Sequence, residues 1–195
     1  MASIEDIKKL RKQTSISLME CKKALEQVDG DMEKAKEVLR KKGMEFARKR
    51  IGRSMAQGII KSYIHSNEKI GVLLDIRCET DFVARSENFH ALAKEVCMQI
   101  AAMSPDFVRR EDIPKEYLDK ERAIYQEQFI KSDKPKEVIV KIVDGKINKL
   151  QDEICLVEQS FIKDQDKKIK NLLDEYRAQL GENISIKRFI RYQID

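Results

Sequence analysis

The sequence predicts an α+β fold in which helices pack on a small antiparallel three-stranded sheet. Helical spacing of apolar residues recurs along most of the chain. Two neighbouring segments at 59–65 and 70–78 instead alternate at period two, and a third such segment at 184–194 ends the sequence. The composition agrees, because 37% of the 195 residues are charged while only 7 are Gly and 3 are Pro, which favours long solvated helices.

Residues 1–53 predict a module of three short helices. Ser3, Ser17 and Asp31 stand at the expected N-cap positions. The apolar stripe of the second helix contains Leu18, Cys21, Ala24, Leu25 and Val28. Gly43 is expected to end the third helix. Such a small bundle buries little apolar area and suits a docking module.

A basic segment at 44–57 predicts a linker, so we expect two domains, residues 1–53 and residues 54–195. The two period-two segments that follow are separated by four polar residues, 66–69, as in an antiparallel hairpin. We expect the terminal strand to join this hairpin and complete the sheet.

Helices fill most of the remaining chain. The expected elements are a helix from about Ser86 to Met103, helices opened by Pro114 and by Pro135, and a helix ended by Gly181. The segment 155–161 is ambiguous between helix and strand. In the terminal strand, the side chains expected to share one face are Ile186, Ile190, Tyr192 and Ile194.

The connection Glu79–Arg85 carries a carboxylate and an aromatic ring between a strand and a helix. Asp81 and Phe82 are adjacent there, and loops on a rigid frame often present functional residues. A structural interpretation is also open. Phe82 would then close the core beneath the loop, and Asp81 would cap the following helix.

Motifs of cofactor-dependent and metal enzymes are absent from the sequence. It has no G-x-G-x-x-G, G-x-x-x-x-G-K-[ST], H-E-x-x-H or G-x-S-x-G pattern. With 2 His and 4 dispersed Cys, we expect no metal site. A nucleophile pair of Cys78 or Cys97 with His90 is an alternative, although both cysteines lie in apolar stripes.

The charge balance is mildly basic, with 39 Lys and Arg against 34 Asp and Glu. Basic clusters at 41–53 and 187–191 would suit a few phosphates, but there is no Trp and no aromatic platform between them. We therefore expect no direct nucleic-acid binding. We also expect no signal peptide and no membrane span, and reduced thiols, which together indicate a cytoplasmic protein.

Several motifs together resemble one family, elongation factor Ts, the guanine-nucleotide exchange factor of the GTPase elongation factor Tu. They are Leu10–Leu25, Ser54–Gly58, Glu79–Arg85, Lys134–Pro135 and Lys141–Lys146. The resemblance runs essentially from end to end. The sequence departs from the family's usual pattern at Ser15, Ser17, Gln57 and Gln99.

The resemblance implies a translation factor without catalytic residues or cofactors of its own. It implies a UBA-like N-terminal module and an exchange loop that disturbs the Mg²⁺ site of elongation factor Tu and promotes GDP release. The residues it implies for that loop are Thr80, Asp81, Phe82 and Val83. Those it implies for docking of the N-terminal module are Arg11, Leu18 and Met19. For Leu18 and Met19, a place in the bundle core is the alternative. A short chain of this type is expected to form a homodimer.

Overall fold

The N-terminal region folds as three helices within the part of residues 1–53 that the structure describes. The computed structural model describes residues 3–14, 16–49, 54–129 and 135–194. The helices are α1 (Ile4–Thr14), α2 (Leu18–Gln27) and α3 (Met32–Lys49). The three expected N-caps are confirmed: Ser3, Ser17 and Asp31 each accept a hydrogen bond from a backbone N–H two or three residues ahead. Ser15 lies outside the described residues.

The core of this module is formed by residues from all three helices. They are Leu10, Cys21, Ala24, Leu25, Ala35 and Leu39. Gly43 does not end α3 as expected, because the helix continues to Lys49. A glycine that ends a helix does so in the left-handed conformation, and Gly43 does not adopt that conformation. The segment expected to be a linker is therefore helical up to Lys49; residues 50–53 lie outside the described part.

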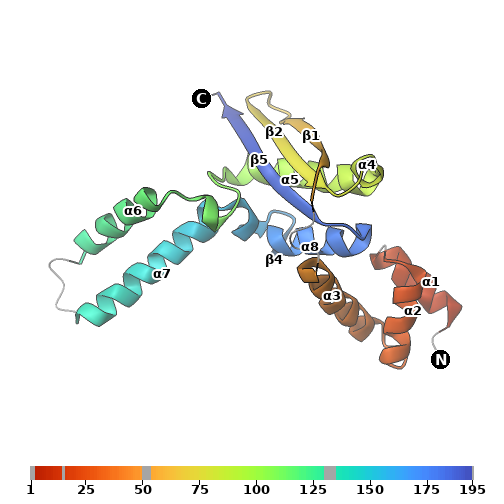
Figure 1. The fold of residues 1–195 in the computed structure, drawn as a ribbon. Coiled ribbons are helices and arrows are strands. Elements are labelled where there is room, and N and C mark those ends of the chain that lie inside the picture. The colour runs from red at the N-terminus through yellow and green to blue at the C-terminus, as the bar shows by residue number, and fades with distance from the viewer. Residues whose placement is uncertain (1–2, 15, 50–53, 130–134, 195) are drawn as a thin grey trace.

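Gly43 marks a close approach between α3 and α8 (Ile169–Leu180). A Cβ atom placed on Gly43 would lie 2.7 Å from Cβ of Ala178, which is shorter than any ordinary contact. The two helices run close together below the sheet (Figure 1). The N-terminal module thus packs directly on the core, while the domain boundary at residues 53 and 54 stays a prediction.

The expected three-stranded antiparallel sheet is confirmed, with strand order β1–β2–β5. Its strands are β1 (Gln57–Ile64), β2 (Ile70–Cys78) and β5 (Ile184–Gln193). Helix α5 (Glu87–Met103) covers one face (Figure 1). Apolar residues of β2, α5, α8 and β5 form the main core beneath that face. The α+β fold class is therefore confirmed.

The expected single face of the terminal strand is wrong. Asp75 pairs with Arg188 and Ile76 with Ile186, so β5 has a bulge at residue 187. A bulge shifts the alternation by one residue. Ile186 consequently faces the core, while Ile190 is 49% exposed on the opposite face.

That opposite face of the sheet, here called the open face, is unusually apolar. Its exposed large apolar residues are Ile60, Ile64, Leu73, Ile190 and Tyr192. The pairing registers place Leu73 beside Ile190, and Ile64 and Tyr192 on either side of Gly71. No described element covers these side chains.

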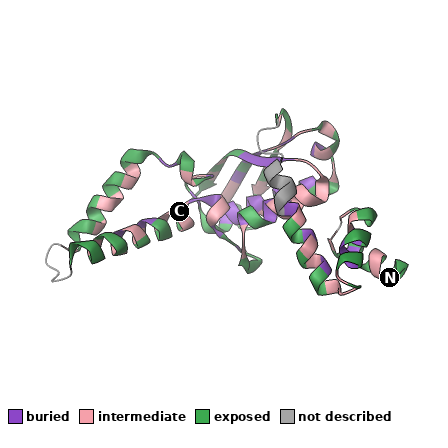
Figure 2. Ribbon diagram, turned by 60° about the horizontal axis from the view of Figure 1, so that its bottom comes forward, coloured by how far each residue is buried: buried purple, intermediate pink, exposed green. Residues whose placement is uncertain are grey.

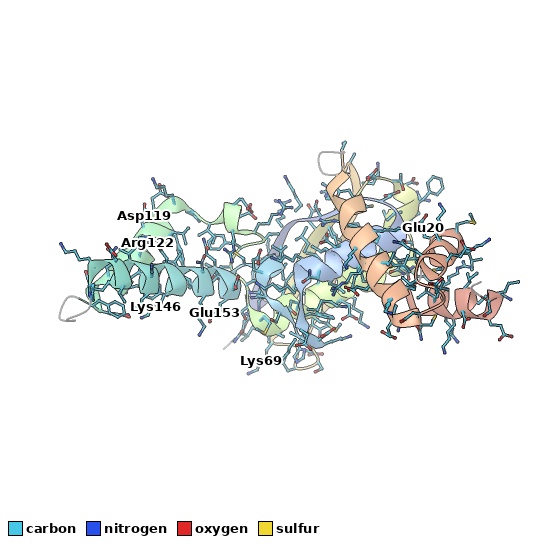
Figure 3. All side chains as sticks on the ribbon, turned by 90° about the horizontal axis from the view of Figure 1, so that it is seen from below. Glu20, Lys69, Asp119, Arg122, Lys146 and Glu153 are labelled. Atoms are coloured by element: carbon cyan, nitrogen blue, oxygen red, sulfur yellow. The ribbon has the colours of Figure 1, made fainter. Side chains whose placement is uncertain are left out.

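Helices α6 (Lys115–Glu127) and α7 (Lys136–Ile154) form an arm that projects away from the body (Figure 1). Pro114 and Pro135 precede them as expected. Figure 2 shows that the arm is mostly exposed, whereas buried residues gather in the body. Arg122 contacts Asp144 at 2.5 Å across the two helices, and Figure 3 shows Arg122 and Lys146 along the arm, at the opposite end of the molecule from Glu20 of α2.

The ambiguous segment before α8 forms a short 3-10 turn (η2, Leu156–Glu158) and a small hairpin. The hairpin pairs β3 (Ser160–Phe161) with β4 (Asp164–Lys168). Gln99 of α5 holds it, because its Nε2 donates to Ser160 O (3.1 Å) and its Oε1 accepts from Ile162 N (2.9 Å). The polar contact made by this fully buried residue is therefore structural.

We expect the same substitution to have opposite effects at two helical glycines. Gly43→Ala forces α3 away from Ala178 and lowers stability, by about 1–3 kcal/mol for overpacking. Gly145→Ala in α7 meets no atom within 4 Å and raises stability by about 0.5–1 kcal/mol, because alanine restricts the unfolded chain.

Urea unfolding of both variants measures these changes. Adding Ala178→Gly to Gly43→Ala should restore part of the loss. Equal gains at the two glycines would contradict the close approach of α3 to α8.

Candidate functional site

The connection after β2 forms a capped helical turn, α4 (Asp81–Ala84). Thr80 is its N-cap, and the Thr80 hydroxyl accepts a hydrogen bond from Val83 N at 3.4 Å. Ser86 caps α5 in the same way, accepting from Phe89 N at 3.3 Å. Caps on both sides of α4 therefore fix the backbone of the loop.

Phe82 lies on this turn with 83% of its surface exposed. Its neighbours differ, because Ala84 is buried and Val83 packs against the main core. Consecutive residues of a helix point in different directions, so burial of these two aliphatic residues directs the ring outward. The interpretation in which Phe82 closes the core is thus wrong.

Asp81 occupies the first turn of α4, and the cap itself is Thr80. The Asp81 carboxylate lies 3.1 Å from Nη2 of Arg85, and the two side chains are 48% and 81% exposed, respectively. An exposed pair of this kind contributes about 0–1 kcal/mol. Asp81 is therefore able to leave Arg85 for another partner at small cost.

A residue that the sequence analysis missed lies against this loop. Glu182, between α8 and β5, accepts hydrogen bonds from the backbone N–H groups of Glu79 (3.1 Å) and Thr80 (3.0 Å). The strand pairing explains this contact, because β2 ends at Cys78, which lies opposite Ile184. An antiparallel pair brings the residues beyond that point together, but the register was not known from sequence.

The N-terminal residues expected to dock a partner lie at the surface. Leu18 is 43% exposed and Met19 63% exposed, and Arg11 is exposed on α1. The alternative that Leu18 and Met19 form the bundle core is wrong. Leu18 also does not belong to the buried stripe of α2, which consists of Cys21, Ala24 and Leu25.

A surface hollow lies between α1 and the first turn of α5. Lys8, Arg11 and Lys12 of α1 line it together with Asn88, in the first turn of α5, and its volume is about 450 Å³. Asn88 follows α4 closely in sequence. Arg11 and the loop therefore lie on neighbouring parts of the same end of the molecule.

The described residues do not assemble a nucleophile or a metal centre. Burial raises the pKa of Cys78 to about 11 and that of Cys97 to about 12, so both thiols stay neutral near pH 7. Within the described ranges, no three His, Cys, Asp or Glu side chains are placed to hold a metal ion together. No described helix combines the length and apolar character that crossing a bilayer requires.

Comparison with known proteins identifies the family. A family model described as Elongation factor TS matches residues 3–195. The chain belongs to the elongation factor Ts family.

Curated relatives with this name are similar over nearly their full length. Elongation factor Ts of Thermosipho melanesiensis is 50% identical over 194 residues, covering 100% of this chain and 99% of the relative. Elongation factor Ts of Thermodesulfovibrio yellowstonii is 53% identical over 188 residues, covering 96% and 94%. That of Thermotoga maritima is 51% identical over 192 residues, covering 98% and 96%.

Membership of the elongation factor Ts family confirms the resemblance and places the chain among translation elongation factors. It does not by itself assign a role to any residue. The structure brings Thr80, Asp81, Phe82 and Val83 together on one short turn. Their roles, and that of the docking surface at Arg11, Leu18 and Met19, stay predictions.

We expect truncation of the exposed N-terminal residues to leave folding nearly unchanged. Leu18→Ala and Met19→Ala should each change the free energy of unfolding by less than about 0.5 kcal/mol, as at other surface positions. Leu25→Ala, at a fully buried position of the same helix, should cost about 2–5 kcal/mol. Urea unfolding of the three variants measures this difference. A loss at Leu18 as large as that at Leu25 would show that Leu18 is a core residue.

Proposed function

We propose that this chain is the guanine-nucleotide exchange factor of elongation factor Tu. The single observation that carries this proposal is the exposed ring of Phe82, presented by a capped turn on a rigid sheet-and-helix core. Membership of the elongation factor Ts family supports the choice of partner. The site of action is the cytoplasm, and the chain uses no cofactor.

Exchange requires no proton transfer and no covalent step. A GTPase holds GDP through phosphate contacts and a Mg²⁺ ion. A protein that binds the nucleotide-free GTPase more tightly than it binds the GDP-bound GTPase must weaken GDP binding. The affinity for GDP falls by the same ratio as the protein's two affinities differ. Differential binding alone therefore accounts for weaker GDP binding, and the release rate rises where the factor also disturbs the phosphate and Mg²⁺ contacts that hold GDP.

The loop supplies the residues for this step. Phe82 inserts between elements of the GTPase, and burial of such a side chain contributes about 1.5–3 kcal/mol. Asp81 exchanges its exposed contact with Arg85 for a contact near the Mg²⁺ site, which disturbs the metal. Thr80 and Val83 hold the turn in shape.

Residues 1–53 act in this proposal as the docking module, and residues 54–195 as the exchange core. Leu18 and Met19 offer an exposed apolar contact, with Arg11 beside the hollow that leads to α5. Because this module packs on α8, docking places the loop at a defined position on the GTPase.

A second copy of the chain is proposed to cover the open face of the sheet. Its exposed apolar residues, centred on Leu73 and Ile190, would pack against the same residues of the second copy across a two-fold axis. Asp75 on the same face is compatible with burial, because Arg77 donates hydrogen bonds to its carboxylate. Those bonds hold the pKa of Asp75 below its ordinary value, so the carboxylate stays ionised and paired.

We expect Phe82→Ala to slow factor-stimulated GDP release by about tenfold or more, as for an aromatic residue at the centre of an interface. The melting temperature of the Phe82→Ala variant should change little, because the ring is exposed. The measurement is the release of labelled GDP from elongation factor Tu with and without the protein. Ile162→Ala, which removes an exposed aliphatic side chain from the β3–β4 hairpin, is the matched control. An unchanged rate for Phe82→Ala would refute the role of this ring.

Leu73→Lys should convert a dimer into a monomer, because two lysines would be buried against each other or against apolar side chains. Ile124→Lys, at a comparably exposed aliphatic position of α6, should leave the dimer intact. Sedimentation equilibrium gives the mass of each. A wild-type protein that sediments as a monomer at micromolar concentration would rule out the dimer.

A further inference from the structure

The carboxylate of Glu182 holds three groups of the loop at once. Besides the N–H groups of Glu79 and Thr80, it accepts the hydroxyl proton of Thr80, with Oγ1–Oε1 at 2.5 Å. In the opposite direction, Glu79 Oε1 accepts from Asn183 N at 2.7 Å. Two segments about a hundred residues apart in sequence are thereby joined.

The Thr80 hydroxyl connects this contact to the turn that carries Phe82. It donates its proton to Glu182 and uses a lone pair to accept from Val83 N. With the proton directed at Glu182, the lone pairs are left for the N-cap bond. Glu182 thus sets the orientation of the hydroxyl that caps α4.

Helix α4 needs such support because it is only 4 residues long. A single turn costs more conformational entropy than its few hydrogen bonds return. Bonds to an ionised acceptor are stronger than neutral ones, so a carboxylate is well suited to hold it.

Glu182 is itself held on both sides. Gly181 adopts φ +72° and ends α8, a conformation that favours glycine. Ile184 then pairs with Cys78 as β5 begins. The backbone that carries this carboxylate is therefore held by α8 on one side and by β5 on the other.

We propose that Glu182 is a positioning residue for nucleotide exchange, acting through Thr80 on the placement of Phe82. This inference rests on the proposed exchange function. In its absence α4 frays, and fewer molecules present the ring in the orientation that the partner accepts. The maximal rate of GDP release is therefore lowered. The half-saturating concentration of this protein stays nearly constant, because docking through α1 and α2 is unchanged.

The experiment compares Glu182→Ala, Glu182→Gln and the control Asp166→Ala, which removes an exposed carboxylate from β4. Labelled-GDP release from elongation factor Tu is measured over a range of factor concentrations. Amide hydrogen exchange is measured on each free protein. Glu182→Ala should lower the maximal rate by about tenfold, because the loop loses the charge-assisted hydrogen bonds that hold it in place. It should also abolish protection of the Thr80 and Val83 amides while leaving α5 protected.

Glu182→Gln should fall between wild type and Glu182→Ala, since its amide oxygen still accepts from the two N–H groups. Thr80→Val combined with Glu182→Ala should cost less than the sum of the two single losses, because both changes remove the bond between the Thr80 hydroxyl and Glu182. A wild-type maximal rate in Glu182→Ala overturns the positioning role. So does a loss of protection that extends through α5. If the wild-type protein itself fails to accelerate release, the proposed function is refuted.

Discussion

The pairing of β5 with β2 is the constraint on which the rest of the structure depends. It adds the third strand to the sheet and completes the core that the sheet forms with α5 and α8. It also joins the C-terminal strand to the middle of the chain. Because β2 ends at Cys78 opposite Ile184, the same pairing brings Glu182 beside Thr80. Stability of the sheet and geometry of the loop therefore have one origin.

The candidate site combines a rigid frame with a small exposed group. Ala84 is buried and Val83 packs on the core, whereas Phe82 between the frame and solvent has almost no contacts of its own. A ring ordered in this way enters a partner with little loss of backbone entropy. The N-terminal module is also held in place, because α3 packs on α8 where Gly43 meets Ala178. Its position relative to the loop is therefore fixed.

Much of the secondary structure could be predicted, because caps and periodicity are local signals. Ser17 and Ser86 cap helices as expected, and Gly181 ends one. The predicted end of α3 at Gly43 was wrong, because this glycine serves a close contact with α8. Such a contact cannot be recognised from the neighbouring residues in the sequence. The terminal strand itself was predicted correctly, but its single face was not, because the bulge at residue 187 depends on pairing with β2. Two-residue β3 is too short to show a period.

Motifs and local chemistry in the sequence were enough to indicate the family, the three N-terminal helices and the position of the loop. The sequence could not decide whether Phe82 is buried or exposed to solvent, because a lone aromatic residue beside the end of a strand is compatible with both. The tertiary structure decided it, through burial of Val83 and Ala84. It also decided that α6 and α7 project as an arm and that Glu182 holds Thr80. These outcomes depend on contacts between segments distant in sequence, and neither side-chain period nor capping chemistry encodes such contacts.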